Sequence, residues 1–362
     1  MSARDCLAIS ASARGAAHIR RGAPNQDFAG CEDFGDGVFA LAISDGHGAA
    51  LHARSADGAR FAVEACLAEM RAAWRARPGA LQASPQDSAR EIFAGALQLW
   101  RDKVEAAIAV SPLDHALDMQ SREAGFGPYG PYGATLVAAL LWPDGGLALQ
   151  LGDGDLLIQD AASDAIMRPI AIDVREGEET ASLCEAQPLL HARFAALAPW
   201  RGACLTSDGF AKSFADAPAA EAAAAALLDR IAGGLPALAL EADLAALSAQ
   251  GSGDDISLAA LARSAARAAA GGSLPNRGQA GQGARGWLIL VIVLLLTALA
   301  GQHFLRPPPP AATPASVAGP AERDPSKSPN KTPAPSQKPK QKLGSAGNSG
   351  GNDGGQTGPR PK

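Results

Sequence analysis

Two hydrophobic patterns alternate along the first 263 residues of the chain. Short apolar runs, most of them ending beside glycine or aspartate, predict strands. The predicted strands cover residues 6–12, 38–44, 134–142, 146–151, 156–160, 203–207 and 256–262. Helical spacing of apolar residues predicts helices over 52–75, 88–110 and much of 217–249. Because the strands group apart from two pairs of helices, the pattern favours an α+β fold with antiparallel sheets covered by helices.

The two long predicted helices have apolar residues that would face a core. These are Phe61, Ala65 and Met70 in the first, and Ile92, Leu97, Leu99 and Val104 in the second. Between residues 111 and 132, Gly-Pro and Pro-Tyr pairs predict a loop. The WPDGG segment that starts at Trp142 predicts a tight hairpin turn between two strands.

The apolar stretch from Trp287 to Leu305 contains no Asp, Glu, Lys or Arg. As a helix it would extend about 28 Å, close to the thickness of a bilayer's hydrocarbon core. Its flanks are Gly/Gln-rich and Pro-rich, which favours a membrane span over the alternative of a buried core helix. We therefore expect a globular domain over 1–265, a flexible linker over 266–286, a transmembrane helix over 287–305 and a disordered Pro/Gly/Lys-rich tail over 306–362.

The N-terminal sequence lacks a basic region followed by a long apolar stretch, so it predicts no signal peptide. This favours a single-pass protein of the inner (cytoplasmic) membrane with its globular domain in the cytoplasm. The tail beyond residue 306 has two interpretations. It is either an inert solvated segment or a periplasmic element that contacts the cell wall.

Charge is divided unevenly along the 362 residues, whose net charge is −5. From Arg306 onwards the chain carries nine Lys or Arg and three Asp or Glu, so the preceding part has a net charge of −11. An acidic globular part argues against nucleic acid as a partner and is compatible with divalent cations. Five scattered cysteines without a CxxC pair indicate reduced thiols, and they are Cys6, Cys31, Cys66, Cys184 and Cys204.

Four aspartates lie where apolar runs meet glycine-containing loops. Asp45 in SDGHG, Asp153 in LGDGD and Asp208 in TSDGF follow predicted strands, and Asp254 in GDDIS precedes one. If the sheets bring these ends together, the carboxylates repel one another unless hard cations bind between them. Oxygen ligands favour Mg²⁺ or Mn²⁺ over zinc. The alternative is that each Asp-Gly pair is an ordinary turn.

Six segments resemble, in this order, the motifs of metal-dependent protein phosphatases of the PP2C type, especially a bacterial branch. They are RRGAPNQDF, ALAISDGHG, GATLVAAL, LQLGDGDLL, CLTSDGF and GDDISLAAL, and the resemblance covers about residues 1–263. It implies an α-β-β-α sandwich of two antiparallel sheets flanked by helix pairs. It also implies hydrolysis of phosphoserine and phosphothreonine in proteins, opposing a Ser/Thr kinase. In that family a metal-bridging water attacks, and Mn²⁺ or Mg²⁺ binds as two ions, with a third in bacterial members.

The resemblance assigns roles to the metal ligands. Asp45 would bridge two cations and Gly46 would contribute its carbonyl oxygen. Asp208 and Asp254 would complete one of the two sites. Asp153 would join Asp208 at the third cation.

Three further roles concern the substrate and water. Asp27 would hold metal-bound waters, and His47 would act as general acid, since imidazole titrates near neutrality. The family's phosphate-binding arginine usually stands five residues before Asp27, where this chain has Gly22. Arg21 and Arg20 are the nearby candidates. This displacement supports an alternative function, a pseudophosphatase that binds phosphoproteins without turnover.

Overall fold

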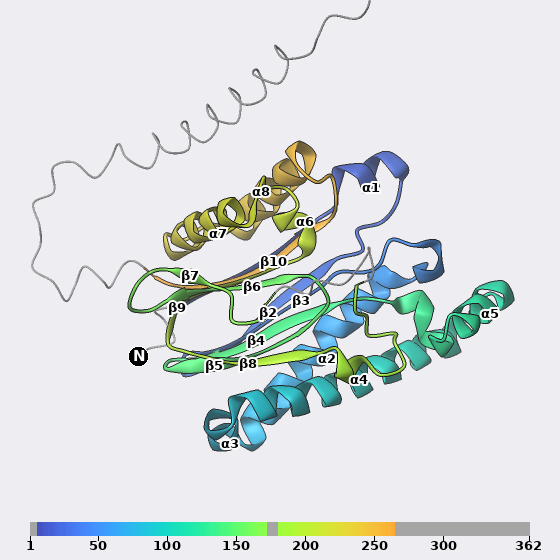
Figure 1. Ribbon diagram of the computed structural model, residues 1–362, viewed down its shortest axis with the longest axis horizontal. Coiled ribbons are helices and arrows are strands. Elements are labelled where there is room, and N and C mark those ends of the chain that lie inside the picture. The colour runs from blue at the N-terminus through green and yellow to red at the C-terminus, as the bar shows by residue number, and fades with distance from the viewer. Residues whose placement is uncertain (1–5, 172–179, 265–362) are drawn as a thin grey trace, which may run out of the picture. The chain divides into compact units, whose positions relative to one another are not determined.

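Residues 6–171 and 180–264, which the computed structural model describes, form two antiparallel sheets stacked face to face between layers of helices (Figure 1). The first sheet has the strand order β1-β10-β9-β6-β7. Its strands are β1 (Cys6–Ala13), β10 (Ile256–Arg263), β9 (Trp200–Thr206), β6 (Asp155–Asp160) and β7 (Ile166–Met167). The second has the order β2-β3-β4-β5-β8. Its strands are β2 (Phe28–Gly35), β3 (Val38–Ser44), β4 (Leu136–Trp142), β5 (Gly145–Leu151) and β8 (Arg193–Leu197).

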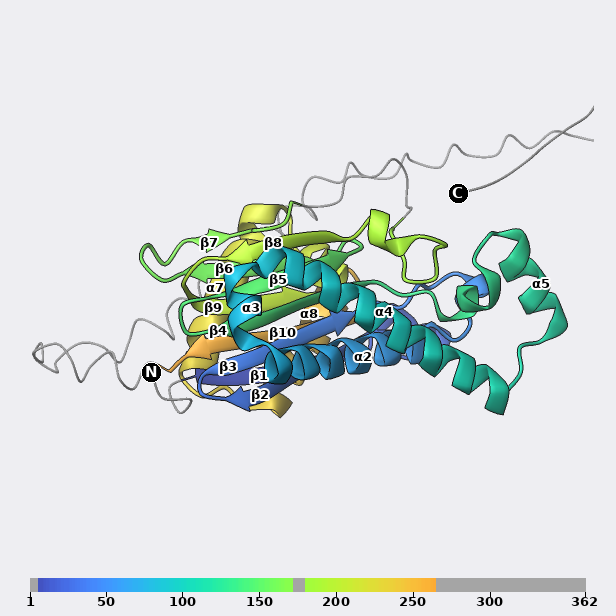
Figure 2. The same ribbon diagram turned by 90° about the horizontal axis from the view of Figure 1, so that it is seen from below.

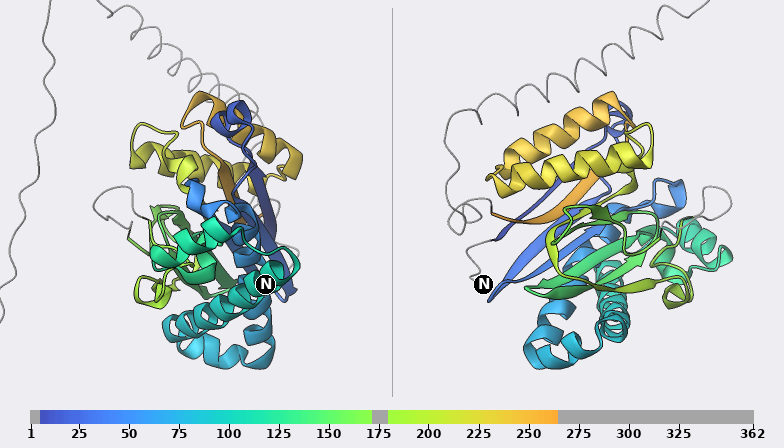
Figure 3. Two further views of the ribbon diagram at one scale, coloured as in Figure 1. Left: turned by 90° about the vertical axis from the view of Figure 1, so that its right-hand side faces the viewer. Right: turned by 60° about the vertical axis from the view of Figure 1, so that its left-hand side comes forward.

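Helices cover the outer face of each sheet. Helices α7 (Ala217–Ala232) and α8 (Ala237–Gln250) lie on the first sheet, and α2 (Ser55–Ala76) and α4 (Pro85–Val110) lie on the second (Figure 3). Figure 2 shows α4 beside α2. The shorter helices are α1 (Ala16–Arg21), α3 (Pro78–Ala83), α5 (His115–Glu123) and α6 (Asp208–Ala211), and the 3-10 turns are η2 (Ala50–His52), η3 (Gly127–Tyr132) and η4 (Pro188–Leu190).

The alternation of side chains along the central strands explains the layers. In β3, Phe39, Leu41 and Ile43 point into the core between the sheets, whereas Val38 and Ala40 point to the core beneath α2 and α4. Successive strand residues face opposite sides, so a strand buried on both faces is apolar throughout. Strands β3, β4 and β5 each have seven residues, and every one of these residues is buried. The α+β prediction of two antiparallel sheets flanked by helices is therefore confirmed.

Some local predictions differ from the structure. Residues 115–123 form a helix inside the predicted loop, because Asp114 caps its first turn by accepting a hydrogen bond from the Ala116 N–H at 2.9 Å. The prediction that Leu99 faces the core was wrong, since this side chain is exposed on α4. Strand β2 was missed because its sequence, FAGCEDFG, carries charged residues on a half-exposed edge.

No helix in residues 6–171 or 180–264 combines the length and the apolar character needed to cross a bilayer. The predicted linker at 266–286, membrane span at 287–305 and tail at 306–362 lie outside the described residues.

Candidate metal centre

The strand register brings the predicted aspartates to the same end of the two sheets. Phe28 pairs with Ser44 at the start of β2 and the end of β3, so Asp27 and Asp45 flank this pair. Thr206, at the end of β9, pairs with both Asp155 of β6 and Leu258 of β10. The residues just beyond these pairs include Asp153, Asp208 and Asp254.

A hollow of about 290 Å³ lies where these strand ends meet. Its lining includes every predicted site residue except Arg20, which is exposed on α1 outside the hollow. The lining residues are His18, Arg21, Gln26, Asp27, Asp45, Gly46, His47, Gly48, Thr135, Asp153, Thr180, Asp208, Lys212, Asp254 and Asp255. Residues separated by more than two hundred positions thus contribute to one site, and Arg21 is the predicted arginine that reaches it.

Backbone contacts fix the position of Asp45. Its N–H donates to the Thr135 hydroxyl at 3.0 Å, and its carbonyl oxygen accepts from the Thr135 N–H at 2.8 Å. The next residue, Gly46, has no room for a side chain, because an added Cβ would lie 2.6 Å from the Gln26 carbonyl oxygen. Thr135 therefore orients the central carboxylate.

The electrostatics of the hollow reflect several crowded carboxylates. Burial raises the pKa of Asp27 to about 8, and the charges of Asp255, Asp208 and Asp254 add to the rise. Burial, then the charges of Asp27 and Asp208, also raises the pKa of Asp45 well above its usual value. For Asp153 the same two causes raise the pKa, burial first and Asp208 second. The protein alone thus disfavours the ionised form of three of these aspartates.

Two observations test whether the site suits divalent cations. The Asp27 Oδ2 and Asp208 Oδ1 atoms are buried and lack a hydrogen-bond partner, which leaves carboxylate oxygens available as ligands. Across the described ranges, no three His, Cys, Asp or Glu side chains stand close enough to form a complete ligand set. Like-charged carboxylates repel until a cation bridges them, so the oxygens fit hard cations although they are not drawn together.

A sixth carboxylate, which was not predicted from the sequence, organises the site. Asp255 is 2% exposed and accepts hydrogen bonds from the Gly15 N–H at 2.6 Å and the Gln26 N–H at 2.7 Å. His18 Nδ1 lies 2.9 Å from Asp255 Oδ2, and His18 Nε2 lies 3.7 Å from Asp254 Oδ1. Asp255 thus ties the segment before β2 to the start of β10. Its place beside Asp254 in GDDIS was the only sequence signal for it.

His47 lies at the edge of the hollow with its ring against His52, at a centroid distance of 4.9 Å. Burial, and then the neighbouring His52, lowers the pKa of His47 to about 4. The imidazole is therefore neutral at pH 7, in contrast to the titration near neutrality expected from the sequence. An incoming phosphate dianion would raise this pKa by favouring the imidazolium.

A second hollow of about 680 Å³ adjoins the first, because His47, Gly48 and Thr180 line both. Ala49, His52 and Phe126 also line it, together with the segment before β8. That segment contributes Ser182, Cys184, Glu185 and His191. The carboxylate-lined hollow therefore opens beside a larger groove of mixed apolar and polar character.

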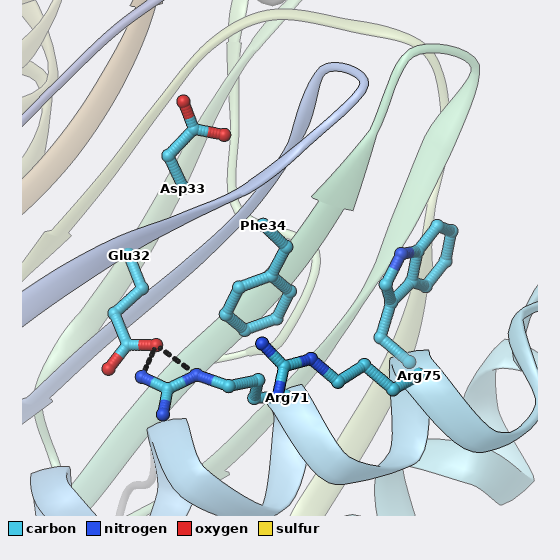
Figure 4. A pocket seen from close by; sticks show the side chains of 6 residues that line it. Glu32, Asp33, Phe34, Arg71 and Arg75 are labelled. Atoms are coloured by element: carbon cyan, nitrogen blue, oxygen red, sulfur yellow. Dashed lines mark hydrogen bonds and ion pairs between the residues drawn. The ribbon is translucent and has the colours of Figure 1, made fainter.

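Another hollow, of about 390 Å³, lies at the opposite end of β2 (Figure 4). It is lined by Glu32, Asp33, Phe34, Arg71, Trp74 and Arg75, and Arg71 binds Glu32 (Figure 4). Two acids stand against two arginines there, so this hollow has no excess negative charge to attract a cation. We assign the metal centre to the smaller hollow for that reason.

Comparisons with known proteins give one family match and several similar solved structures. A family model described as Protein phosphatase 2C matches residues 14–247. The catalytic domain of the serine/threonine phosphatase PstP, solved with two manganese ions, is 17% identical, with a TM-score of 0.45 and coverage of 72% of this chain and 98% of that chain. The S. agalactiae serine/threonine phosphatase is 16% identical, with a TM-score of 0.46 and coverage of 71% and 99%. PppA of Pseudomonas aeruginosa is 16% identical, with a TM-score of 0.42 and coverage of 71% and 97%.

No curated protein matches the chain significantly. The family match, however, extends over more than half of the sequence. The chain belongs to the protein phosphatase 2C family of metal-dependent serine/threonine protein phosphatases, which use Mn²⁺ or Mg²⁺.

Proposed function

We propose that this family member is a membrane-tethered phosphatase that removes phosphate from phosphoserine and phosphothreonine in cytoplasmic proteins. The observation that carries the catalytic part is the convergence of five predicted aspartates and Arg21 on one hollow. The same convergence disfavours the alternative interpretation, in which each Asp-Gly pair is only an isolated turn. It also disfavours a pseudophosphatase, because the predicted carboxylates all line the site.

The residues of the hollow divide between cation binding and phosphate binding. Asp45, the Gly46 carbonyl oxygen, Asp208 and Asp254 would hold two divalent cations. Such cations polarise phosphoryl oxygens and supply a nucleophile from water at neutral pH. Arg21 would orient the phosphate, because a guanidinium can donate two parallel hydrogen bonds to one oxyanion. Asp27, which is buried in the same hollow, would hold water near the cations.

His47 would donate a proton to the leaving oxygen. We expect His47→Asn to lower kcat/KM for a phosphothreonine peptide about a hundredfold, and for p-nitrophenyl phosphate less than about tenfold. A serine or threonine alkoxide is a poor leaving group without a proton, whereas p-nitrophenolate leaves unaided. Steady-state kinetics on both substrates measure the difference, with the exposed His115→Asn as control. An equal loss on both substrates would show that His47 is not the acid.

The larger groove beside the metal centre suits the polypeptide around a phosphorylated residue. Its volume of about 680 Å³ exceeds what a phosphate needs, and Phe126 offers an apolar contact. This feature supports a protein substrate over a small phosphate ester.

Catalytic turnover separates the proposal from its alternative. The full-length chain should release phosphate from phosphoserine and phosphothreonine peptides in the presence of Mn²⁺, and chelation by EDTA should stop the reaction. A pseudophosphatase would instead bind Mn²⁺ and phosphopeptides without release of phosphate.

Membrane tethering is supported by the uncharged stretch from Trp287 to Leu305. We expect the full-length chain to sediment with membranes after an alkaline carbonate wash, and a variant that lacks residues 287–305 to remain in the supernatant. Equal sedimentation of the two proteins would overturn this part of the proposal. Because the proposed substrates are phosphoserine and phosphothreonine in proteins, we also propose that a Ser/Thr kinase acts in opposition to this phosphatase.

A further inference from the structure

Lys212 is a cation supplied to the metal centre by the chain itself. It follows the short helix α6, one helical turn after Asp208, and its N–H donates to the Asp208 carbonyl oxygen at 2.9 Å. Residues four positions apart lie on the same side of a helix. The Lys212 ammonium accordingly binds Asp208 Oδ2, and Lys212 lines the hollow with the aspartates.

The two oxygens of Asp208 have different surroundings. Oδ2 is bound to the Lys212 ammonium, whereas Oδ1 is buried and has no hydrogen-bond partner. Asp208 can therefore offer Oδ1 to a divalent cation while Lys212 holds Oδ2. A second cation at Oδ2 would have to displace the ammonium.

Asp153 lines the same hollow as Lys212. Its Oδ2 accepts a hydrogen bond from the Thr180 hydroxyl at 2.9 Å. The positive charge of Lys212 also acts on Asp153, where it lowers the pKa against the larger effects of burial and Asp208. Both aspartates that the family resemblance assigns to a third cation thus interact with groups of this protein.

The charges around the hollow correspond to two divalent cations. Six aspartates and two permanent cations, Arg21 and Lys212, line it. Among these aspartates and two cations alone, four negative charges remain when every aspartate is ionised, as many as two divalent cations neutralise. The Lys212 side chain is 58% exposed, so its single ion pair is weak. Attraction by several carboxylates together holds the ammonium at the mouth of the hollow.

We propose that Lys212 occupies the place of a third metal ion between Asp208 and Asp153, so that this phosphatase binds two divalent cations. This inference rests on the proposed metal centre. Lys212 acts as a positioning residue: it holds Asp208 with one oxygen toward the paired cations, and it repels a further ion.

The test compares metal binding by three full-length proteins: the wild type, Lys212→Met and Lys212→Arg. Equilibrium dialysis against Mn²⁺, with metal content measured by mass spectrometry, gives the ions bound per chain. We expect two for the wild type and for Lys212→Arg. Lys212→Met keeps the side-chain length but removes the charge, so a third Mn²⁺ should bind at least about tenfold more tightly than any third ion in the wild type.

The matched control is Lys103→Met, which removes an ammonium that pairs with Glu64 and lies outside the hollow. It should leave the count at two. Three ions in the wild type, with the third lost in Asp153→Asn, would overturn the inference, as would an unchanged count of two in a folded Lys212→Met protein. Absence of any saturable Mn²⁺ binding by the wild type would instead contradict the metal centre itself, so the two failures are distinguishable.

Discussion

Asp45→Asn is expected to reduce Mn²⁺-dependent hydrolysis of p-nitrophenyl phosphate by at least about a thousandfold. Asparagine preserves the shape of the side chain and leaves the backbone hydrogen bonds to Thr135 intact. It removes the negative charge at the centre of the carboxylate cluster, and a neutral amide is a poor bridge between two cations. Initial rates at saturating Mn²⁺ measure the effect.

The same substitution should not unfold the protein. Burial and neighbouring carboxylates raise the pKa of Asp45, so its ionised form destabilises the metal-free protein, and asparagine relieves that cost. We expect metal-free Asp45→Asn to melt at or above the wild-type temperature. Asp36→Asn, an exposed change in the β2–β3 turn, serves as control. Retention of more than about a tenth of the activity by Asp45→Asn would contradict the ligand role.

The metal-free protein is expected to lose stability as pH rises from about 4 to about 8. The pKa of Asp27 is raised from 3.8 to about 8, so the folded state binds its proton more tightly than the unfolded state does. Below pH 4 the carboxyl group is protonated in both states and contributes nothing. Above pH 8 it is ionised in both, and folding must bury the charge, at a cost of up to about 6 kcal/mol. Urea unfolding of EDTA-treated protein across this range measures the loss.

Mn²⁺ should reverse this dependence. A cation that binds the ionised cluster in the folded state stabilises it most where the carboxylates are deprotonated, so the gain from metal should increase with pH. Asp27→Asn should flatten the metal-free profile. A metal-free stability that rises steadily between pH 4 and pH 8, or a gain from Mn²⁺ that falls with pH, would contradict the electrostatic description.

The fold could be predicted well where a strand is buried on both faces. The run from Val38 to Ser44 is apolar at every position except the last, and only a central strand buries both of its faces. Edge strand β2 escaped prediction because its charges face partly to solvent, and Glu32 is matched by Arg71 from a distant helix. The sequence around Glu32 does not indicate that Arg71 binds it.

The carboxylates of the candidate site could be predicted from the sequence, but most of the residues that contact them could not. Asp45, Asp153, Asp208 and Asp254 each stand beside glycine or a strand end, which is a local pattern. The roles of Asp255 and Lys212 depend on contacts that only the fold creates. The sequence around Lys212 predicts only an ordinary solvent-exposed lysine.

Asp255 binds the N–H groups of Gly15 and Gln26, more than two hundred positions away. His47 is a further case, because its lowered pKa comes from burial and from His52. The sequence shows neither its burial nor the contact between the two rings.

The most direct test of the metal centre is a crystal structure of the full-length protein soaked in Mn²⁺, with data collected at the manganese absorption edge. We expect two anomalous peaks in the hollow, both within bonding distance of Asp45, with Asp208 and Asp254 as further ligands. Peaks elsewhere, or no peak beside Asp45 at saturating Mn²⁺, would contradict the assignment.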